Sequence, residues 1–416
     1  MRQKVIEHIK TAVIVLLLCS AAVLAFAANF PQTLQQLQDS LSTSGAATPP
    51  TAERGEFAVA AKPIAISIRN ETGRQTIARD FSQLDSTYEA FAGYLGEALA
   101  TAEPPQRLST SALPALSQLE GLYFCYAGAI PLDALAQWLE SEYDDATLNA
   151  SWFFLAVDSK ETVTLYFGTE TATYRCATQL VSAALLEQIS TIRPDGSYFA
   201  GESQTASLSR VNPRSLLLSE QSNQAAAAAA ASAVTEDLCT QIASKLQFNP
   251  YGDGAYRTTD GTVVYTESLC SLRITPEGQL SLVNQDASRY SARSASNSDL
   301  ITTAYTAIAS LTDLFTSDAR IYLTGVFQQD NQITLYFDYL LDGLVIAQQQ
   351  GHDASVTFTD GTISTMILWL RTYTRQDTTM TVLPAPQAAA LLYSGALLQL
   401  EYADLGDGTL QLGWKA

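Results

Sequence analysis

The stretch LCSLRITPEGQLSLV, residues 269–283, carries the clearest information about the fold of this chain. Apolar and polar residues alternate on both sides of Pro-Glu-Gly, which is typical of two strands joined by a tight turn. The segment ASVTFTDGTISTMILWL, which begins at residue 354, has the same design with Asp-Gly in the turn. Gly278 and Gly361 are expected to adopt positive φ in these turns. The two segments therefore predict two hairpins of one kind.

An amphipathic helix and another hairpin are expected before each of these segments. Residues 237–248 (DLCTQIASKLQF) and 299–315 (DLITTAYTAIASLTDLF) carry apolar side chains at helical spacing. We therefore predict two tandem helix-plus-antiparallel-sheet units, a second unit at residues 234–297 and a third unit at 298–416. The third unit should end in a hairpin at the Asp-Gly turn of LLQLEYADLGDGTLQLGWKA. Chance similarity between hairpins is the alternative to a duplication.

Residues 61–218 are expected to form a first α+β domain. Helices are predicted at residues 84–100, from Ile130 and at 179–189, and strands at 63–70, 121–126, 151–158, 162–168 and 172–178. Pairs of strands between helices favour the α+β class. Residues 219–233 are interpreted as an alanine-rich linker, because alanines favour helix but no pattern there defines a packed face.

The N-terminal residues predict a membrane anchor. Residues 1–10 form a basic stub with Arg2, Lys4 and Lys10, and residues 11–30 (TAVIVLLLCSAAVLAFAANF) contain no charge. Twenty apolar residues in a helix span a hydrocarbon core of roughly 30 Å. Cationic residues favour the cytoplasmic side, so the stub should lie in the cytoplasm. The protein would then cross the cell membrane once, with the residues after the span outside the cell. Residues 31–60 would be a stalk.

Two further readings concern this anchor. Ala25-Phe26-Ala27 is a triplet after which a signal peptidase could cut, which would make the segment a secretory signal. If residues 11–30 stay uncut as a transmembrane helix, the small residues on one face of that helix would allow another transmembrane helix to approach closely. That face is formed by Ile14, Leu18, Ala21, Ala25 and Ala28. Chance is the alternative explanation of this spacing.

Charge and cysteine content restrict the function classes. The formal net charge is -19 and the pI is near 4.4, without clusters of Lys and Arg, which excludes nucleic acid as a partner. Outside the anchor the cysteines are Cys125, Cys176, Cys239 and Cys270. They could form two disulfides outside the cytoplasm or be four small buried thiols. No CxxC pair indicates a structural zinc site.

The search for catalytic chemistry finds little. The only histidines are His8, on the stub, and His352, in the polar turn QQQGHDAS. A Ser-His-Asp triad would have to use His352, whereas a solvated loop histidine is the simpler interpretation. The HExxH, GxSxG, SxxK and P-loop motifs are all absent from the sequence. We therefore expect a protein that is not an enzyme, with no catalytic, cofactor-binding or metal-binding residues.

A family resemblance covers most of the chain. The order of basic stub, single span, stalk and α+β ectodomain is combined with IPLDALAQWL, LQFNPYGDGAYRTTDGTVVYTESLCSLRITPEGQLSLV, LYFDYLLDGLVI and the terminal hairpin. Together they resemble the YycH (WalH) group, membrane-anchored regulators of a cell-wall-controlling histidine kinase in Gram-positive bacteria. Such proteins often end in Pro-Trp, where this chain has Gly413-Trp414.

The resemblance implies signal transduction without catalysis. The expected function is modulation of a membrane sensor histidine kinase of a two-component system through protein–protein contacts, with a YycI-like protein as a further partner. The alternative is a secreted or surface-anchored binding module for a wall or extracellular ligand. An enzyme without a recognisable motif is the third reading.

Overall fold

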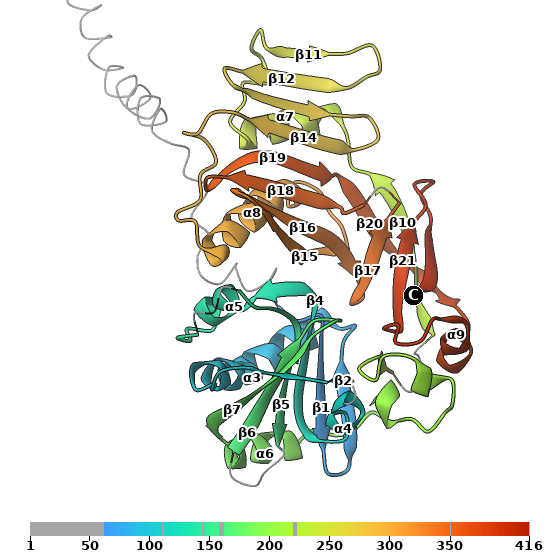
Figure 1. The fold of residues 1–416 in the computed structure, drawn as a ribbon. Coiled ribbons are helices and arrows are strands. Elements are labelled where there is room, and N and C mark those ends of the chain that lie inside the picture. Colours follow the sequence, from blue (N-terminus) through green and yellow to red (C-terminus); the bar gives the residue numbers. More distant parts are fainter. Residues whose placement is uncertain are drawn as a thin grey trace, which may run out of the picture.

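The chain folds as two lobes, each built on a mainly antiparallel sheet, with a smaller group of elements beside them (Figure 1). This computed structural model describes residues 62–109, 112–143, 145, 147–157, 162–218, 223–349 and 351–415. Strands and helices are mixed along these residues, with strands in the majority. The predicted α+β class is confirmed.

Seven strands form the sheet of the first lobe, in the order β2-β1-β4-β5-β6-β7-β3. They are β1 (Ala65–Asn70), β2 (Gly73–Ile77), β3 (Gln106–Leu108), β4 (Glu120–Pro131), β5 (Asn149–Val157), β6 (Thr162–Gly168) and β7 (Thr173–Val181). The five strands predicted for this region correspond to β1, β4, β5, β6 and β7, and are confirmed. β2 and β3 are additional, and both lie at the edges of the sheet.

Helices cover one face of this sheet. They are α3 (Phe81–Ala100), α5 (Leu132–Trp138) and α6 (Ser182–Ser190), and the short α4 (Leu113–Leu116) packs beside Phe199 near the other face. The buried stripe of α3 includes Leu84, Phe91 and Leu95, at the predicted helical spacing. The Asp80 side chain caps this helix by accepting hydrogen bonds from two backbone N–H groups of its first turn. α6 begins later than predicted, because β7 continues to Val181 and pairs there with Thr162 of β6.

The second lobe contains an 11-stranded sheet with the path β11-β12-β13-β14-β19-β18-β16-β17-β21-β22, and β15 pairs with β16 off this path. Its strands are β11 (Ala255–Arg257), β12 (Val263–Glu267), β13 (Cys270–Ile274), β14 (Gln279–Asn284), β15 (Arg320–Gln329), β16 (Gln332–Leu341), β17 (Leu344–Gln348), β18 (Ala354–Thr359), β19 (Thr362–Trp369), β21 (Gln399–Asp404) and β22 (Leu410–Lys415). The terminal hairpin is confirmed as β21 and β22, which pair antiparallel.

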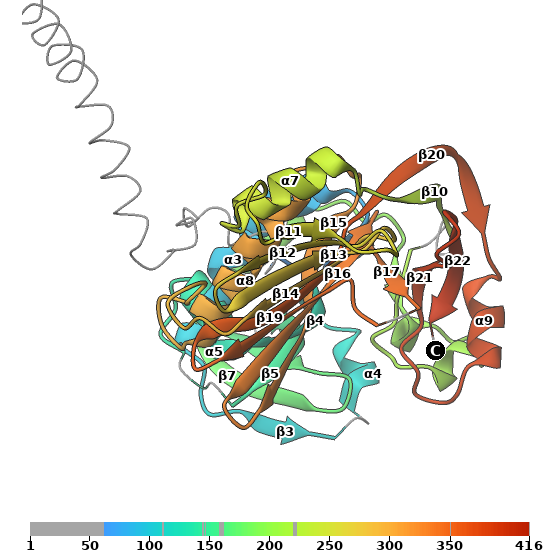
Figure 2. The same ribbon diagram turned by 90° about the horizontal axis from the view of Figure 1, so that it is seen from above.

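The helices α7 (Glu236–Lys245) and α8 (Asn297–Thr312) pack on one face of this large sheet (Figure 2). In each unit a helix is followed by four strands paired in a meander, β11-β12-β13-β14 and β15-β16-β18-β19, and β14 and β19 join the two meanders. Gly278 and Gly361 have φ of 106° and 78° in the corresponding turns. The predicted positive φ at both glycines is confirmed.

The alanine-rich stretch is a strand, which corrects the expectation of a helix-favouring linker. Within residues 219–233, β10 (Gln224–Ser232) pairs antiparallel with β20 (Arg371–Thr381). The alanine N–H and C=O groups find partners in β20, and Ala230 also donates from its N–H to the carbonyl of Gly408 at 3.0 Å. These long-range pairings outweigh a helix propensity of less than about 1 kcal/mol per residue.

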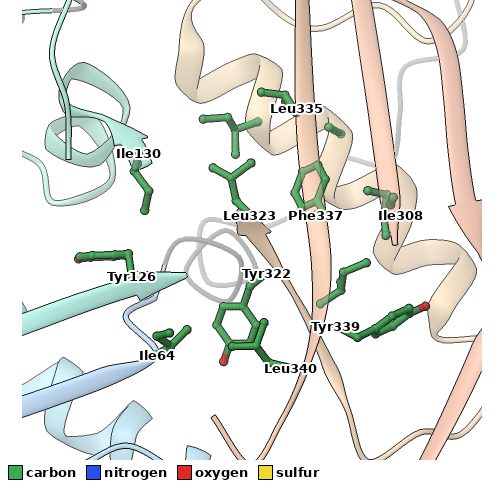
Figure 3. Close-up of a cluster of buried hydrophobic side chains, with 14 of the residues drawn as sticks. Ile64, Tyr126, Ile130, Ile308, Tyr322, Leu323, Leu335, Phe337, Tyr339 and Leu340 are labelled. Carbon is green, nitrogen blue, oxygen red and sulfur yellow. The ribbon is translucent and has the colours of Figure 1, made fainter. Parts of the chain in front are cut away.

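The lobes meet in a shared apolar core. Figure 3 shows Ile64, Tyr126 and Ile130 of the first lobe facing Tyr322 and Leu323 of β15, all of them buried. β4 and β15 approach so closely at this junction that a Cβ atom at Gly128 would lie 2.0 Å from the carbonyl oxygen of Thr324. Packing of this density between the lobes makes them one body rather than two linked domains.

Polar contacts between α5 and α8 add to the junction. Asn297 donates from Nδ2 to both carboxylate oxygens of Asp133 at 3.0 Å, and Ser298 donates to Oε1 of Gln137 at 2.5 Å. The first turn of α8 therefore bonds to the side of α5 in the other lobe.

The smaller group of elements connects the lobes on the other side. Residues 198–217, with β8 (Tyr198–Phe199) and β9 (Leu216–Leu217), pack against α9 (Ala385–Leu391). Buried Arg74 of β2 donates to Glu202 at 2.6 Å and to the carbonyl of Ser117 at 2.9 Å, and its guanidinium lies over the ring of Phe199. Residues assigned by the sequence to the first domain thus also contact the third unit.

The predicted membrane anchor, residues 11–30, the stub before it and the stalk at 31–60 lie outside the described residues. Among the helices that the structure describes, none has the length and apolar character to cross a membrane.

Candidate functional site

A cavity with a volume of about 470 Å³ lies between the lobes and is the main candidate site. The first lobe contributes the β4 segment around Gly128 and the β6–β7 turn at residues 169–171. The second lobe contributes the start of β17 and His352, and residues 214–218 and 397–400 complete the wall. The volume is in the range of pockets that hold a small molecule or a short peptide. Because its wall comes from segments far apart in sequence, this cavity exists only when the lobes are docked.

Arg214 is one of the cations in the cavity wall. Its guanidinium lies 4.5 Å from the centre of the Trp152 ring, and Nη2 donates to the carbonyl of Thr169 at 3.2 Å. A cation over an aromatic face gains about 0.5–2 kcal/mol. Arg79 and Lys415 also line the cavity, together with the acids Glu170 and Asp338. The chain as a whole has a net charge of -19, but this wall contains more cationic than acidic side chains.

His352 and Asp338 form the polar cluster of the cavity. Nδ1 of His352 lies 2.8 Å from Oδ2 of Asp338, and the imidazole stacks on Tyr336 with ring centres 4.4 Å apart. The same carboxylate accepts from the Thr324 hydroxyl at 2.5 Å and from the Asp353 N–H at 3.0 Å. The hydrogen bond to Asp338 raises the pKa of His352 above its usual value. The imidazole is therefore held in place and is easier to protonate than a free one.

This cluster does not form a hydrolase triad. A triad needs a histidine between a carboxylate and a nucleophilic hydroxyl. Among the described residues the His352 ring contacts Asp338 and Tyr336, neither of which is the required serine. Asp338 is occupied by Thr324 and by a backbone N–H, so it links β15, β16 and the segment before β18. The cluster can fix the wall of the cavity and respond to pH.

Asp353 is a second acid beside this cluster, and it is fully buried. Its Oδ2 accepts from the N–H of Tyr339 at 2.8 Å. Burial raises the pKa of Asp353 well above its usual value, so the carboxyl is far easier to protonate than an exposed one. The deeply buried position, away from the cavity wall, indicates a structural role.

Arg371 and Asp404 form a buried ion pair behind the cavity. The guanidinium donates twice to the carboxylate, from Nε at 3.0 Å to Oδ2 and from Nη2 at 2.7 Å to Oδ1. Tyr373 and Gln348 donate to the same carboxylate at 3.3 Å. These residues belong to β20, β21 and β17, so the pair joins two successive strands to a third that is earlier in the chain. Paired and hydrogen-bonded, it is a structural feature and not a free reactive group.

The four described cysteines are free thiols. Cys125 lines the cavity, and burial raises the pKa of its thiol to about 11. The other three, Cys176, Cys239 and Cys270, are buried. Of the two interpretations left open by the sequence, the structure has free thiols rather than disulfides, and three of the four are buried. A thiol with a raised pKa is a poor nucleophile at neutral pH.

The described residues contain no group of three or more His, Cys, Asp or Glu side chains able to hold a metal ion. The predicted interaction residues Ile14, Leu18, Ala21, Ala25 and Ala28 lie outside the described residues. His352 is placed in a bonded cluster, with 43% of its side chain exposed, rather than in the freely solvated loop that the sequence favours.

Sequence reasoning missed Asp338 and Arg214. Asp338 had a local signal, since it is a lone charge in the apolar run LYFDYLL of residues 335–341. A charge in such a run is costly to bury unless it is bonded. Arg214 had no such signal, because its partners Trp152 and Thr169 are distant in sequence.

Comparisons with known proteins identify no relative: no family model, no curated protein and no solved structure matches this chain.

Proposed function

We propose that this protein is a membrane-anchored regulator, not an enzyme, that modulates a cell-wall-related sensor histidine kinase through protein–protein contacts outside the cytoplasm. The observation that carries the proposal is the basic stub, uncharged span and stalk that precede the folded lobes. This order places a folded body beside a membrane, where it can meet the extracytoplasmic part of a membrane kinase. The resemblance to the YycH group supports the same function and names a YycI-like protein as a further partner.

The composition of the candidate site is consistent with a role without catalysis. Its histidine is bonded to Asp338, and the pKa of its cysteine thiol is raised by burial. The buried carboxyls of Asp353 and Asp404, away from the cavity wall, are engaged in structural contacts. Catalysis requires a nucleophile or an acid–base pair that is free to meet a substrate.

The two tandem units support the same proposal through their shared strand order. Duplication of a helix-plus-meander unit, with β14 and β19 at the joint, would explain why the corresponding strands meet. A large sheet of this kind offers an extended surface for a protein partner.

The anchor can be tested by protease accessibility. Protease added outside intact cells should cut the stalk near residues 42–51, while a tag placed before Met1 should stay protected. A soluble product that begins at Ala28 would show instead that the segment is a cleaved signal.

The contact with the kinase can be tested at the anchor seam, defined as Ile14, Leu18, Ala21, Ala25 and Ala28. Ala21→Leu with Ala25→Leu should preserve insertion and abundance yet change kinase output, because bulky side chains prevent close helix approach. Val13→Leu with Val23→Leu is the matched control and should leave output unchanged. If a polyleucine helix replaces the whole span without a change in signalling, contact through the membrane is wrong and the lobes alone must act.

The cavity favours a second candidate function, a surface-anchored binding module for a wall or extracellular ligand. Arg79, Arg214 and Lys415 in the wall suit a ligand that carries carboxylates. Arg214→Met should then abolish binding of acidic soluble wall fragments, measured by calorimetry, whereas Arg107→Met on exposed β3 should not. Equal binding by both variants would remove the cavity as the site.

A further inference from the structure

No helix among the described residues covers one face of the large sheet. α7 and α8 lie along the other face (Figure 2). Leu280, Leu282, Met366 and Leu368 are buried in the core that also contains apolar side chains of these helices. Successive side chains of a strand point to opposite faces, so the residues next to these on β14 and β19 point to the face opposite α7 and α8. There the side chain of Val283 is 38% and that of Ile367 is 37% exposed. We call this second side, on β11 to β16, β18 and β19, the open face.

Hydroxyl side chains cross the open face in register. Residues directly opposite one another on paired strands share a face. One row runs from Thr266 through Ser271, Val283, Thr365 and Thr357 to Thr334, each paired with the next. The hydroxyls of Thr334 and Thr357 lie 3.0 Å apart, which places both side chains on this side. The row contains five hydroxyls and no charge.

The neighbouring row has a similar character. It runs through Arg273, Ser281, Ile367, Ser355 and Tyr336, again in register. Arg273 is the one charged residue in the two rows, although the chain has 42 acidic residues. Acids appear in the turns at the ends of these strands, at Asp260, Glu277, Asp330 and Asp360. The two rows of the open face thus carry one cation and no carboxylate, and acids lie in the turns at their ends.

We propose that the open face binds a second copy of this chain, face to face, in a symmetric dimer. Two chains of net charge -19 repel each other over most of their surfaces, so they can approach most closely where the carboxylates are missing. A hydroxyl both donates and accepts hydrogen bonds, so a row of Ser and Thr is complementary to another copy of itself. A symmetric two-fold contact requires a self-complementary patch of this kind.

The size of the open face indicates a weak dimer. Eight strands spaced about 4.8 Å apart span about 34 Å, and two rows of side chains cover about 14 Å along the strands. The contact would bury about 500 Å² per copy, or about 1,000 Å² in total, which is near the lower limit for a specific interface. Anchoring both copies in one membrane would raise their effective concentration.

The test is sedimentation velocity of the full-length chain in a mild non-ionic detergent, at about 1–100 µM protein and about 50 and 300 mM NaCl. The expected result is a concentration-dependent shift from monomer to dimer that is stronger at high salt, because salt screens the repulsion between the acidic copies. Thr365→Glu with Ile367→Glu should weaken the dimer at least tenfold, since both side chains point outward from the open face.

The matched control is Thr374→Glu with Thr379→Glu, which adds the same charge at exposed positions of β20, away from the open face. It should dimerise like the wild type. Circular dichroism should give both variants the wild-type melting profile, and if the open-face variant fails to fold, Ser281→Asp alone replaces it. A wild type that stays monomeric over the whole range, or a dimer that the open-face substitutions leave unchanged, overturns the proposal. In those cases any partner on this surface is a different molecule, or the anchor makes the dimer.

Discussion

The second and third units share a helix followed by a four-stranded meander, yet they have different neighbours in the molecule. The edge strand of the third unit, β15, lies against β4 of the first lobe, whereas the edge strand of the second unit, β11, is the outermost strand of the sheet. The helices differ in the same way. The first turn of α7 has the exposed acids Glu236 and Asp237, and that of α8 has Asn297 and Ser298 bonded to α5.

This difference teaches that a local pattern specifies a unit but not its neighbours. Hairpin turns and apolar periodicity are alike in the two units. Docking of the third unit on the first lobe depends on a few positions. Gly128 permits the close approach of β4 and β15, and Asn297 and Ser298 bond to α5. Changes at these positions should therefore separate the two units experimentally.

The largest effect is expected from Gly128→Ala at the β4–β15 junction. The new Cβ would lie 2.0 Å from the Thr324 carbonyl oxygen, so backbone must move and the lobes must separate. We expect a loss of about 3 kcal/mol in the free energy of unfolding, measured by urea denaturation. Gly93→Ala is the control, because it lies in α3 with open space around it and should be neutral or stabilising by up to about 1 kcal/mol. Wild-type stability of Gly128→Ala would mean that the strands are not in contact.

The equivalent turn glycines allow a direct comparison of the two units. Both have positive φ, so alanine costs roughly 1 kcal/mol at either position. A Cβ at Gly278 would also lie 3.0 Å from the Leu370 carbonyl oxygen, whereas Gly361 has open space. We expect Gly278→Ala to lose about 2 kcal/mol and Gly361→Ala about 1 kcal/mol in urea denaturation. Equal losses would contradict the packing of the β13–β14 turn against Leu370.

A smaller effect is expected at the first turns of the helices. Asn297→Ala removes two hydrogen bonds to the Asp133 carboxylate, and should cost about 1–2 kcal/mol in the free energy of unfolding. Asp237→Ala in α7 is the counterpart in the second unit, where an exposed acid bonds only to Gln241 within its own helix. Its cost should be a few tenths of a kcal/mol. The reverse order of the two losses would mean that α8 does not dock on α5.

The smallest effect is a dependence on pH confined to the third unit, because the second contains no histidine. The hydrogen bond to Asp338 raises the pKa of His352, so its contribution to stability is full below the unfolded pKa of about 6.5 and is lost as pH rises through the folded pKa. His352→Gln should therefore be less stable than wild type at pH 6, and the difference should shrink by pH 8.

This difference should stay below about 1 kcal/mol, since 43% of the His352 side chain is exposed and solvent screens the pair. Urea midpoints at pH 6, 7 and 8 measure it. The raised pKa of buried Asp353 makes stability fall with rising pH in both proteins, so comparison with wild type at each pH removes that contribution. A difference that is constant over this range would rule out the His352–Asp338 pair as its source.

Sequence alone determined the local structure of this protein. The buried stripe of α3, the glycine turns at Gly278 and Gly361, the terminal hairpin and the α+β class all follow from spacing and turn chemistry. These features depend on residues within a few positions of one another, whose helical or alternating periodicity is visible in the chain. The expected absence of a catalytic motif and the charge-based exclusion of nucleic acid likewise rest on composition.

Only the tertiary structure decided how these elements combine. The alanines of β10 became a strand because β20 supplied hydrogen-bond partners, against their own preference for helix. The joining of β14 to β19, the pairing of His352 with Asp338 and the cavity between the lobes depend in the same way on segments distant in sequence. Backbone groups and charges must find partners when they are buried, and which partner is available depends on the whole fold rather than on neighbours in the chain.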